Sequence, residues 1–363
     1  MRFCALSRSL QAIGYPMQFV NRLIQGLLVI WGIVTLLFVI FYGLGDPTSF
    51  LVGDQADEAT RAAVRKKYGL DKPFGVQYLG YLNGLSPLGW VADADRTATK
   101  HLALISGEKG ALALKSPDLG RSFQSNQPVT PMILSRLEGT LILAMSAIVF
   151  ASVLGIFLGK IAAMNRDTWW DRGILSASVL GISAPSFFLG VLIAWLFAVV
   201  LGEWTGLHVT GHIFTEKVFE PGREVLLKNL LLPALALGIR PLAIFTQLTR
   251  SSMIDVLHTD YMRTARAKGL SARTVMLRHA LRNALNPVIT SITGWLASLL
   301  AGAFFIEYIF NWQGIGKLMI DALEKQDMPV ILGTAIFIGA VFVCITILTD
   351  ASYRLLDPRV RLD

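Results

Sequence analysis

The sequence has little charge. Asp, Glu, Lys and Arg make up 16% of its 363 residues, whereas soluble domains carry roughly 25%. Hydrophobic residues make up 53%, and several apolar runs reach about 20 residues, enough to cross the hydrocarbon core of a bilayer. This composition excludes a soluble globular enzyme. It predicts an all-α, polytopic membrane protein, because chains cross lipid only as helices or closed barrels.

The sequence also lacks catalytic motifs. It contains no G-x-x-x-x-G-K-[ST] phosphate loop, no H-E-x-x-H and no G-x-S-x-G, so we expect the chain to be no enzyme and to hydrolyse no ATP itself. Its two cysteines, Cys4 and Cys344, lie far apart in sequence and predict neither a disulfide framework nor a metal site. The net charge of +8 does not indicate nucleic-acid binding, because the basic residues gather in short loops beside apolar runs.

Six apolar runs predict six transmembrane helices. The third run is long enough to tilt in the bilayer or to extend past it. Gly155 and Gly159 in the second run would let another helix approach closely. The predicted spans are residues 23–42, 140–159, 174–201, 230–248, 286–306 and 329–348.

Basic residues gather in alternate loops. They lie in the N-terminal tail, after the second span, after the fourth span and at the C-terminus: Arg2, Arg8, Arg22, Lys160, Arg166, Arg172, Arg250, Arg263, Arg266, Lys268, Arg273, Arg278, Arg282, Arg354, Arg359 and Arg361. The positive-inside rule places these segments, and both termini, in the cytoplasm. The membrane is expected to be a bacterial inner membrane. The long polar loop 43–134, between the first two spans, is then external.

The chain divides into three regions. Residues 1–16 are too short and too polar to span, so they form an N-terminal extension, and Met1 and Met17 are both candidate starts. Region 17–134 holds the first span and the external loop, in which 58–68 predicts a helix ended by Gly69. Segment 86–117 has no clear periodicity and is interpreted as an insertion. Region 135–363 carries the other five spans and a cytoplasmic loop, 250–285.

Loop 250–285 is more ordered than the positive-inside rule requires. Residues 260–268 predict a short helix with Asp260 at its N-terminus, where negative charge is favourable. Gly269 suits the left-handed position that ends a helix. Ser271 can cap a second helix, which we expect to end before Pro287. So short a helix is unstable alone in water, which favours a docking surface over an ordinary basic loop.

This loop resembles the cytoplasmic coupling loop, E-A-A-x-x-x-G, of the membrane subunits of binding-protein-dependent ABC importers. Gly269 matches the glycine and Ala265 the second alanine, whereas Arg263 and Thr264 replace the first two residues. With these departures the stretch is similar to the dipeptide/oligopeptide permeases. Within them it resembles the branch that is the first of the two permease subunits of its transporter. Further motifs occur in the same order: Gly45-Asp46-Pro47, 68–73, Gln77-Tyr78, 118–122, 181–187, Leu248-Thr249-Arg250 and 355–361.

The resemblance implies a type I ABC importer permease fold and a role in ATP-driven import. A homologous second permease chain, two cytoplasmic ATPase subunits, an external solute-binding protein and membrane lipid would be the partners. ATP and Mg would bind the partner subunits, with no cofactor on this chain. Peptides are the expected cargo, and related permeases carry nickel or glutathione. The residues expected to couple to the ATPase are Asp260, Tyr261, Arg263, Thr264, Ala265, Arg266, Lys268 and Gly269.

Irregular residues within the spans indicate a candidate translocation path. Pro185, flanked by Ser183 and Ser186, and Pro233 would free backbone carbonyls, which is tolerated where a helix lines a cavity or packs on protein. Plain helix packing is the alternative. Arg240 is the one charge deep in a predicted span. It could meet a peptide carboxylate, pair with a carboxylate on another helix, or lie nearer the interface.

A self-sufficient secondary transporter or channel is the alternative function. Such a protein needs intramembrane acidic residues for ion coupling, and no predicted span has Asp or Glu at its centre. It would also leave the ordered loop 250–285 unexplained.

Overall fold

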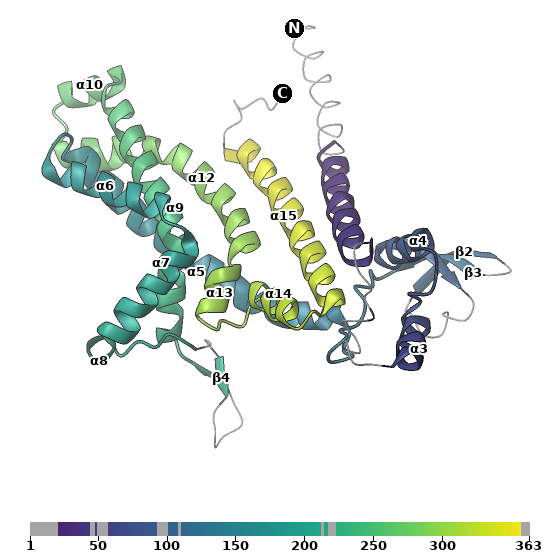
Figure 1. Ribbon diagram of the computed structural model, residues 1–363. Helices are drawn as coiled ribbons and strands as arrows, with labels where there is room; N and C mark the ends of the chain where they lie inside the picture. Colours follow the sequence, from purple (N-terminus) through teal and green to yellow (C-terminus); the bar gives the residue numbers. More distant parts are fainter. Residues whose placement is uncertain are drawn as a thin grey trace, which may run out of the picture. The chain divides into compact units, whose positions relative to one another are not determined.

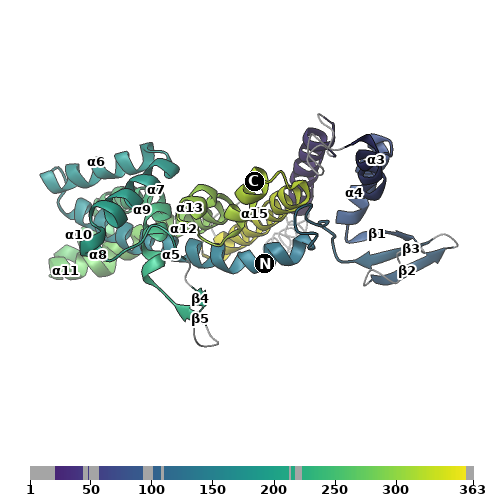
Figure 2. The ribbon, with the colours of Figure 1, turned by 60° about the horizontal axis from the view of Figure 1, so that its bottom comes forward.

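The computed structural model describes residues 21–43, 48, 57–92, 101–107, 110–211, 214–216 and 223–356. These residues are mostly helical, with two small antiparallel sheets that the sequence did not predict (Figures 1 and 2). The extension 1–16, the Gly45-Asp46-Pro47 motif and residues 357–361 lie outside the described residues.

Four described helices are long and apolar enough to cross a membrane, or five if a sharply bent pair counts as one span. The predicted span 286–306 coincides with a further helix, α12, which is not among them. The four are Asn21–Tyr42, α5 (Val129–Met164), α9 (Lys228–Leu257) and Met328–Thr349 within α15 (Met328–Leu356). The bent pair joins α6 (Trp169–Ser183) to Ser186–Val200, which comprises α7 (Ser186–Ala194) and the π-helical turn Trp195–Val200.

The third predicted span is sharply bent, as a broken span or a re-entrant loop would be. Its two halves meet at an angle of 110°, at Ala184 and Pro185, whose ψ angles are both 138°. Proline has no N–H to continue the helix, and it pushes the residue before it toward extended backbone. The sequence therefore identified the residue, but not the size of the bend.

The described residues form two compact units. The first comprises residues up to 135 together with 318–340. In it, buried Phe38 of the first helix stacks on Tyr42 and meets the ring of Tyr78 of α4 (Phe74–Leu85), with centroids 4.5 and 5.3 Å apart. The predicted helix before α4 is confirmed as α3 (Glu58–Tyr68), and Gly69 takes a left-handed φ of 67° at its end.

The segment interpreted as an insertion is folded. Strands β1 (Leu88–Ala92), β2 (His101–Gly107) and β3 (Gly110–Lys115) form an antiparallel sheet in the order β1-β3-β2. The Asn83 side chain fastens this sheet to α4, because it accepts from the N–H of Trp90 at 2.8 Å and donates to its carbonyl at 2.9 Å. A register shift between Ala103 and Ile105 breaks the alternation, which explains why no periodicity is visible in the sequence.

Residues 118–122 have a structural role in the first unit. Gly120 has a φ of 83°, in the left-handed region. The Ser122 hydroxyl and the Phe123 N–H donate to the buried carboxylate of Asp327, at 2.5 and 2.9 Å. A single carboxylate thus holds a loop that lies about 200 residues away in sequence.

The second unit comprises residues 136–317 and 341 onward, with α9 packed against α6, α7 and α12. A Cβ on Gly155 would lie 2.9 Å from the Leu242 carbonyl oxygen, and one on Gly159 would lie 2.5 Å from that of Thr246. The predicted close approach is therefore confirmed, and the neighbour is α9. The shorter elements are α8 (Gly202–Thr205), β4 (Phe214–Glu216), β5 (Arg223–Val225), α10 (Asp260–Ala267), α11 (Ala272–Thr274), α13 (Phe304–Ile309) and α14 (Ile315–Glu324), of which α14 runs into the first unit.

Candidate functional site

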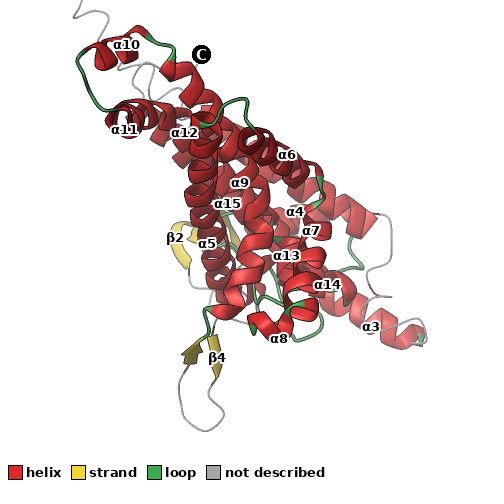
Figure 3. Cartoon of the chain, turned by 90° about the vertical axis from the view of Figure 1, so that its left-hand side faces the viewer, coloured by secondary structure: helices red, strands yellow, loops and turns green. Residues whose placement is uncertain are grey.

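The helix predicted in loop 250–285 is confirmed as α10, which follows the end of α9 (Figure 3). Thr259 before it has extended backbone, with φ −77° and ψ 154°. Gly269 after it has a φ of 77°, and a Cβ there would meet nothing within 4 Å. Glycine is therefore favoured at this position by its backbone conformation and not by lack of space.

The inner face of α10 packs on the chain itself. Met262 is 0% exposed and Ala265 is 8% exposed, and both join a cluster with Val275 and Ala280 of the following segment. The surface that so short a helix requires is therefore supplied by its own chain. Instability of the isolated helix is no longer an argument for a partner, and Ala265 leaves the set of residues available for docking.

The outer face of α10 is polar and mostly cationic. Asp260 and Arg263 form an exposed ion pair, 3.4 Å between Oδ1 and Nη1, and such pairs contribute little to stability. The Tyr261 hydroxyl accepts a hydrogen bond from Asn283 at 2.9 Å. The exposed members of the predicted docking set are Asp260, Tyr261, Arg263, Thr264, Arg266, Lys268 and Gly269.

The helix after α10 begins as predicted but does not end as predicted. The Ser271 hydroxyl accepts from the Thr274 N–H at 3.3 Å, which confirms the cap. The helix then continues through a π-helical turn, Val275–Leu281, into α12 (Arg282–Gly302), with Pro287 inside it. The prediction of an end before Pro287 is wrong, because a proline removes one hydrogen bond but need not stop a long membrane helix.

An ion pair joins α9, the helix before α10, to α6. The Arg250 guanidinium of α9 donates to the two carboxylate oxygens of Asp171 on α6, at 2.5 and 2.6 Å. Asp171 is 2% exposed and also accepts from the Asp167 N–H at 2.9 Å. Two parallel bonds of this kind fix orientation as well as distance. The sequence singled out Arg250 but not Asp171, whose only signal was an acidic residue in the first turn of a helix.

A polar groove runs along α12. A cavity of about 350 Å³ is lined there by Pro287, Thr290, Ser291, Gly294, Trp295 and Ser298. Thr290, Gly294 and Ser298 are four residues apart, so they share one face of the helix, and all three are exposed. Polar groups exposed at membrane depth face water or protein rather than lipid. This groove was not predicted from the sequence, although the spacing of the hydroxyls is a visible signal.

The residues predicted to line a path are scattered. Ser183 and Pro185 are exposed and Ser186 is half-buried at the break after α6, whereas Pro233 is buried in the core of α9. Arg240 is exposed and has no ion-pair partner among the described residues. None of them lines the α12 groove, and the burial of Pro233 agrees with the alternative of plain packing.

Several of the described helices are long and apolar enough to cross a membrane. They define a multi-pass membrane protein. Within that class, the chain belongs to the binding-protein-dependent transport system inner membrane components. The family profile of that description matches residues 151–362, and the profile of the N-terminal part of such membrane components matches residues 17–144.

Curated relatives match along nearly the whole chain. The chain is 34% identical to the di/tripeptide transport system permease protein of Pseudomonas aeruginosa, over 93% of this chain and 96% of that protein. It is 32% identical to the dipeptide transport system permease protein of Alkalihalophilus pseudofirmus, over 94% of this chain and 98% of that protein. The similarity to these permeases therefore extends along almost the full length of both chains.

A solved structure shares the fold. A chain of the methionine ABC transporter MetNI, crystallised in inward-facing conformations, superposes with a TM-score of 0.50 at 14% identity. The match covers 63% of this chain and 97% of that one. At this identity the likeness describes the fold alone.

Proposed function

We propose that this chain is the permease subunit of an ATP-driven importer that moves peptides across the bacterial inner membrane by alternating access. Six transmembrane helices would form a type I importer fold, with α12 as the fifth, loop 43–134 outside and both termini in the cytoplasm. A second, homologous permease chain would complete the pathway. A solute-binding protein would deliver cargo from outside, and two ATPase subunits would bind ATP and Mg inside.

The observation that carries this proposal is the build of α10. Met262 and Ala265 fix its inner face to the chain, so a push on its outer face is transmitted to α9 and α12 rather than absorbed by a mobile loop. Rigid-body movement of this kind links remote sites. The exposed residues Asp260, Tyr261, Arg263, Arg266 and Lys268 are the contacts we assign to the ATPase.

The α12 groove supports a path for a polar cargo. Its hydroxyls can exchange hydrogen bonds with a peptide backbone without selecting side-chain charge. An importer whose selectivity is set by a separate binding protein needs such a permissive lining. Ser183, Pro185, Ser186 and Arg240 remain candidate residues for another part of the path, whereas Pro233 is buried in the core of α9.

The first experiment tests the ATPase contact. The chain is produced with the subunits encoded beside it, extracted in mild detergent and purified through a tag on the permease. We expect the wild type to retain the ATPase and Arg263→Glu/Arg266→Glu to lose it while still inserting. Lys66→Glu, the same reversal at an exposed cation of α3, is the matched control and should retain it. Failure of the wild type to hold an ATPase would favour a self-sufficient transporter or channel.

The second experiment tests the path. In a Cys4→Ser/Cys344→Ser background, Ser298→Cys on the α12 groove should react with a hydrophilic, membrane-impermeant thiol reagent. Val153→Cys is the control, because Val153 of α5 is 67% exposed within an apolar span and should face lipid. Equal reactivity at the two positions would contradict the assignment of the groove. Uptake of a labelled tripeptide, competed by excess nickel or glutathione, then distinguishes the cargoes.

A further inference from the structure

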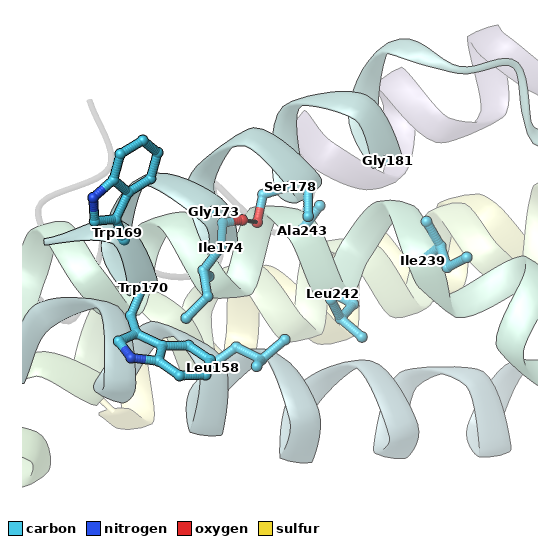
Figure 4. A pocket seen from close by; sticks show the side chains of 11 residues that line it. Leu158, Trp169, Trp170, Gly173, Ile174, Ser178, Gly181, Ile239, Leu242 and Ala243 are labelled. Carbon is cyan, nitrogen blue, oxygen red and sulfur yellow. Dashed lines mark hydrogen bonds between the residues drawn. The ribbon is translucent and has the colours of Figure 1, made fainter. Parts of the chain in front are cut away.

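A cavity of about 710 Å³ lies between α5, α6 and α9 (Figure 4). Gly173, Ala177 and Gly181 are spaced four residues apart on α6, and their lack of bulk opens this face of the helix. Leu158 of α5 and Leu242 of α9 form the opposite walls. The cavity is separate from the α12 groove and shares no residue with it.

The lining offers no free hydroxyl to a polar ligand. Ser178 is the one hydroxyl among the lining residues, and it donates to the carbonyl of Ile174 at 2.9 Å and is 5% exposed. Apart from the indole N–H groups of Trp169 and Trp170 at one end, the other side chains that line the cavity are apolar. The ligand that fits is therefore apolar.

The cavity is too small to enclose a transmembrane helix. A helix with its side chains is about 10 Å across, so a volume of 710 Å³ holds roughly six residues of one. A membrane span needs about 20 residues. A single hydrocarbon chain is much thinner than a helix and can lie along this cavity.

One end of the cavity is aromatic. Trp169 and Trp170 lie together at that end, and Gly181 and Ile239 lie at the other (Figure 4). The two indoles are 86% and 71% exposed. Tryptophan favours the level of the lipid headgroups, so the occupant has its polar end beside these rings and its apolar end toward Ile239.

The turn between α5 and α6 carries a surplus of positive charge. Lys160, Arg166 and Arg172 lie in or beside it, against one exposed carboxylate, Asp167, which is 3.4 Å from Arg166. The other carboxylate, Asp171, is engaged by Arg250. Cations near a membrane surface attract anionic headgroups.

We propose that this cavity binds an acyl chain of an anionic phospholipid, whose phosphate lies near Arg166 and Arg172. The inference rests on the proposed function only for the placement of these helices in a bilayer. A bound chain would fill the space between α5, α6 and α9 beside the Asp171–Arg250 pair. The site would then hold a lipid that exchanges more slowly than the surrounding bilayer.

The complex with its partner subunits is placed in vesicles of equal phosphatidylglycerol and phosphatidylethanolamine and purified from them in mild detergent. Native mass spectrometry then measures the phospholipid that the complex retains. Gly173→Leu places a branched side chain in the cavity, where a Cβ at this position meets nothing within 4 Å. We expect it to lose most of the retained phosphatidylglycerol. Gly202→Leu, at an equally open glycine of α8, should change nothing. Arg166→Gln/Arg172→Gln should lower the preference for phosphatidylglycerol by about fivefold per cation removed.

Equal retention by the wild type and Gly173→Leu would overturn the proposal. The proposal would also be overturned if the wild type retained no lipid and a Trp170→Cys variant cross-linked to the second permease chain, because protein would then cover the cavity. A wild type that binds phosphatidylglycerol but no ATPase would contradict the proposed function and leave the lipid site standing. The two ideas therefore fail separately.

Discussion

The second unit holds two buried carboxylates in different ways. Asp171 faces a guanidinium, and both of its oxygens accept from Arg250. Glu307 of α13, 0% exposed, is bound by neutral donors: the Thr140 hydroxyl at 2.7 Å and the Lys317 N–H at 3.1 Å. The first arrangement depends on one charged partner. The second distributes the carboxyl group over several hydrogen bonds, so we expect it to tolerate neutral replacements that the first does not.

The loop around Glu307 is shaped to its carboxyl group. A Cβ on Gly314 would lie 2.3 Å from the Glu307 carboxyl atoms, and one on Gly316 would lie 2.9 Å from Oε2. Buried Trp312 donates from its indole N–H to the Gly139 carbonyl at 2.8 Å. The chain from Trp312 to Lys317 is thereby fastened to the start of the apolar part of α5.

The largest effect is expected for Arg250→Ala, which leaves Asp171 buried without its cation. Removal of one partner of a buried pair costs about 3–5 kcal/mol. Asp171 lies in the first turn of α6, outside the dense core, so we expect the lower end, about 3 kcal/mol. The measurement is thermal unfolding of the purified complex in detergent.

The control for Arg250→Ala is Arg263→Ala, whose pair with Asp260 is exposed on both sides and should leave the unfolding temperature unchanged. An Asp171→Asn/Arg250→Met double variant removes both charges and should recover much of the loss. Equal destabilisation by Arg250→Ala and Arg263→Ala would show that burial does not distinguish the two pairs.

The next largest loss of stability is expected for Glu307→Ala. It opens a cavity and leaves the Thr140 hydroxyl and the Lys317 N–H without acceptors, which costs about 2–3 kcal/mol. Glu307→Gln keeps the size and one acceptor oxygen, so it should retain most of the stability. If Glu307→Gln is as damaging as Glu307→Ala, the negative charge matters, and the contrast with Asp171 is lost.

The sequence predicted what depends on neighbouring residues. Four of the predicted spans, or five with the bent pair, follow from apolar runs. The ends of α3 and α10 follow from Gly69 and Gly269, because left-handed backbone at a helix end favours glycine. The Ser271 cap is equally local.

The missed features depend on residues far apart or on competing rules. Asp171 and Arg250 are 79 residues apart, and Thr140 and Glu307 are 167 apart, so no local pattern announces either contact. Pro185 breaks its helix by 110° whereas Pro287 lies within one. The same residue type thus has two outcomes, which the local sequence does not distinguish. The α12 groove follows from the spacing of hydroxyls, which is a weaker signal than a proline or a charge within an apolar run.

Thr140→Val isolates the neutral arrangement. The Thr140 hydroxyl donates to Glu307 and accepts from the Ile315 N–H at 2.9 Å, so an isosteric methyl group removes both bonds. We expect a loss of about 1–2 kcal/mol in thermal unfolding, near the upper limit for hydrogen bonds in membrane helices. Thr140→Ser keeps both bonds and should lose less. An unchanged unfolding temperature in Thr140→Val would place the fastening of Glu307 elsewhere.

The smallest effect is expected for Thr249→Val, the same chemical change on α9. Thr249 is 0% exposed, but its hydroxyl has no hydrogen-bond partner among the described residues. A buried hydroxyl without a partner is already unfavourable, so an apolar isostere should be neutral or slightly stabilising. The methyl group of Thr249 packs near Gly159 of α5, and valine retains it. Thr140→Val and Thr249→Val make the same chemical change, once at a hydroxyl that forms hydrogen bonds and once at a hydroxyl that forms none with the described residues. If both variants lose stability equally, the cost arises from repacking, and hydrogen bonding would not explain why Glu307 can be buried without a cation.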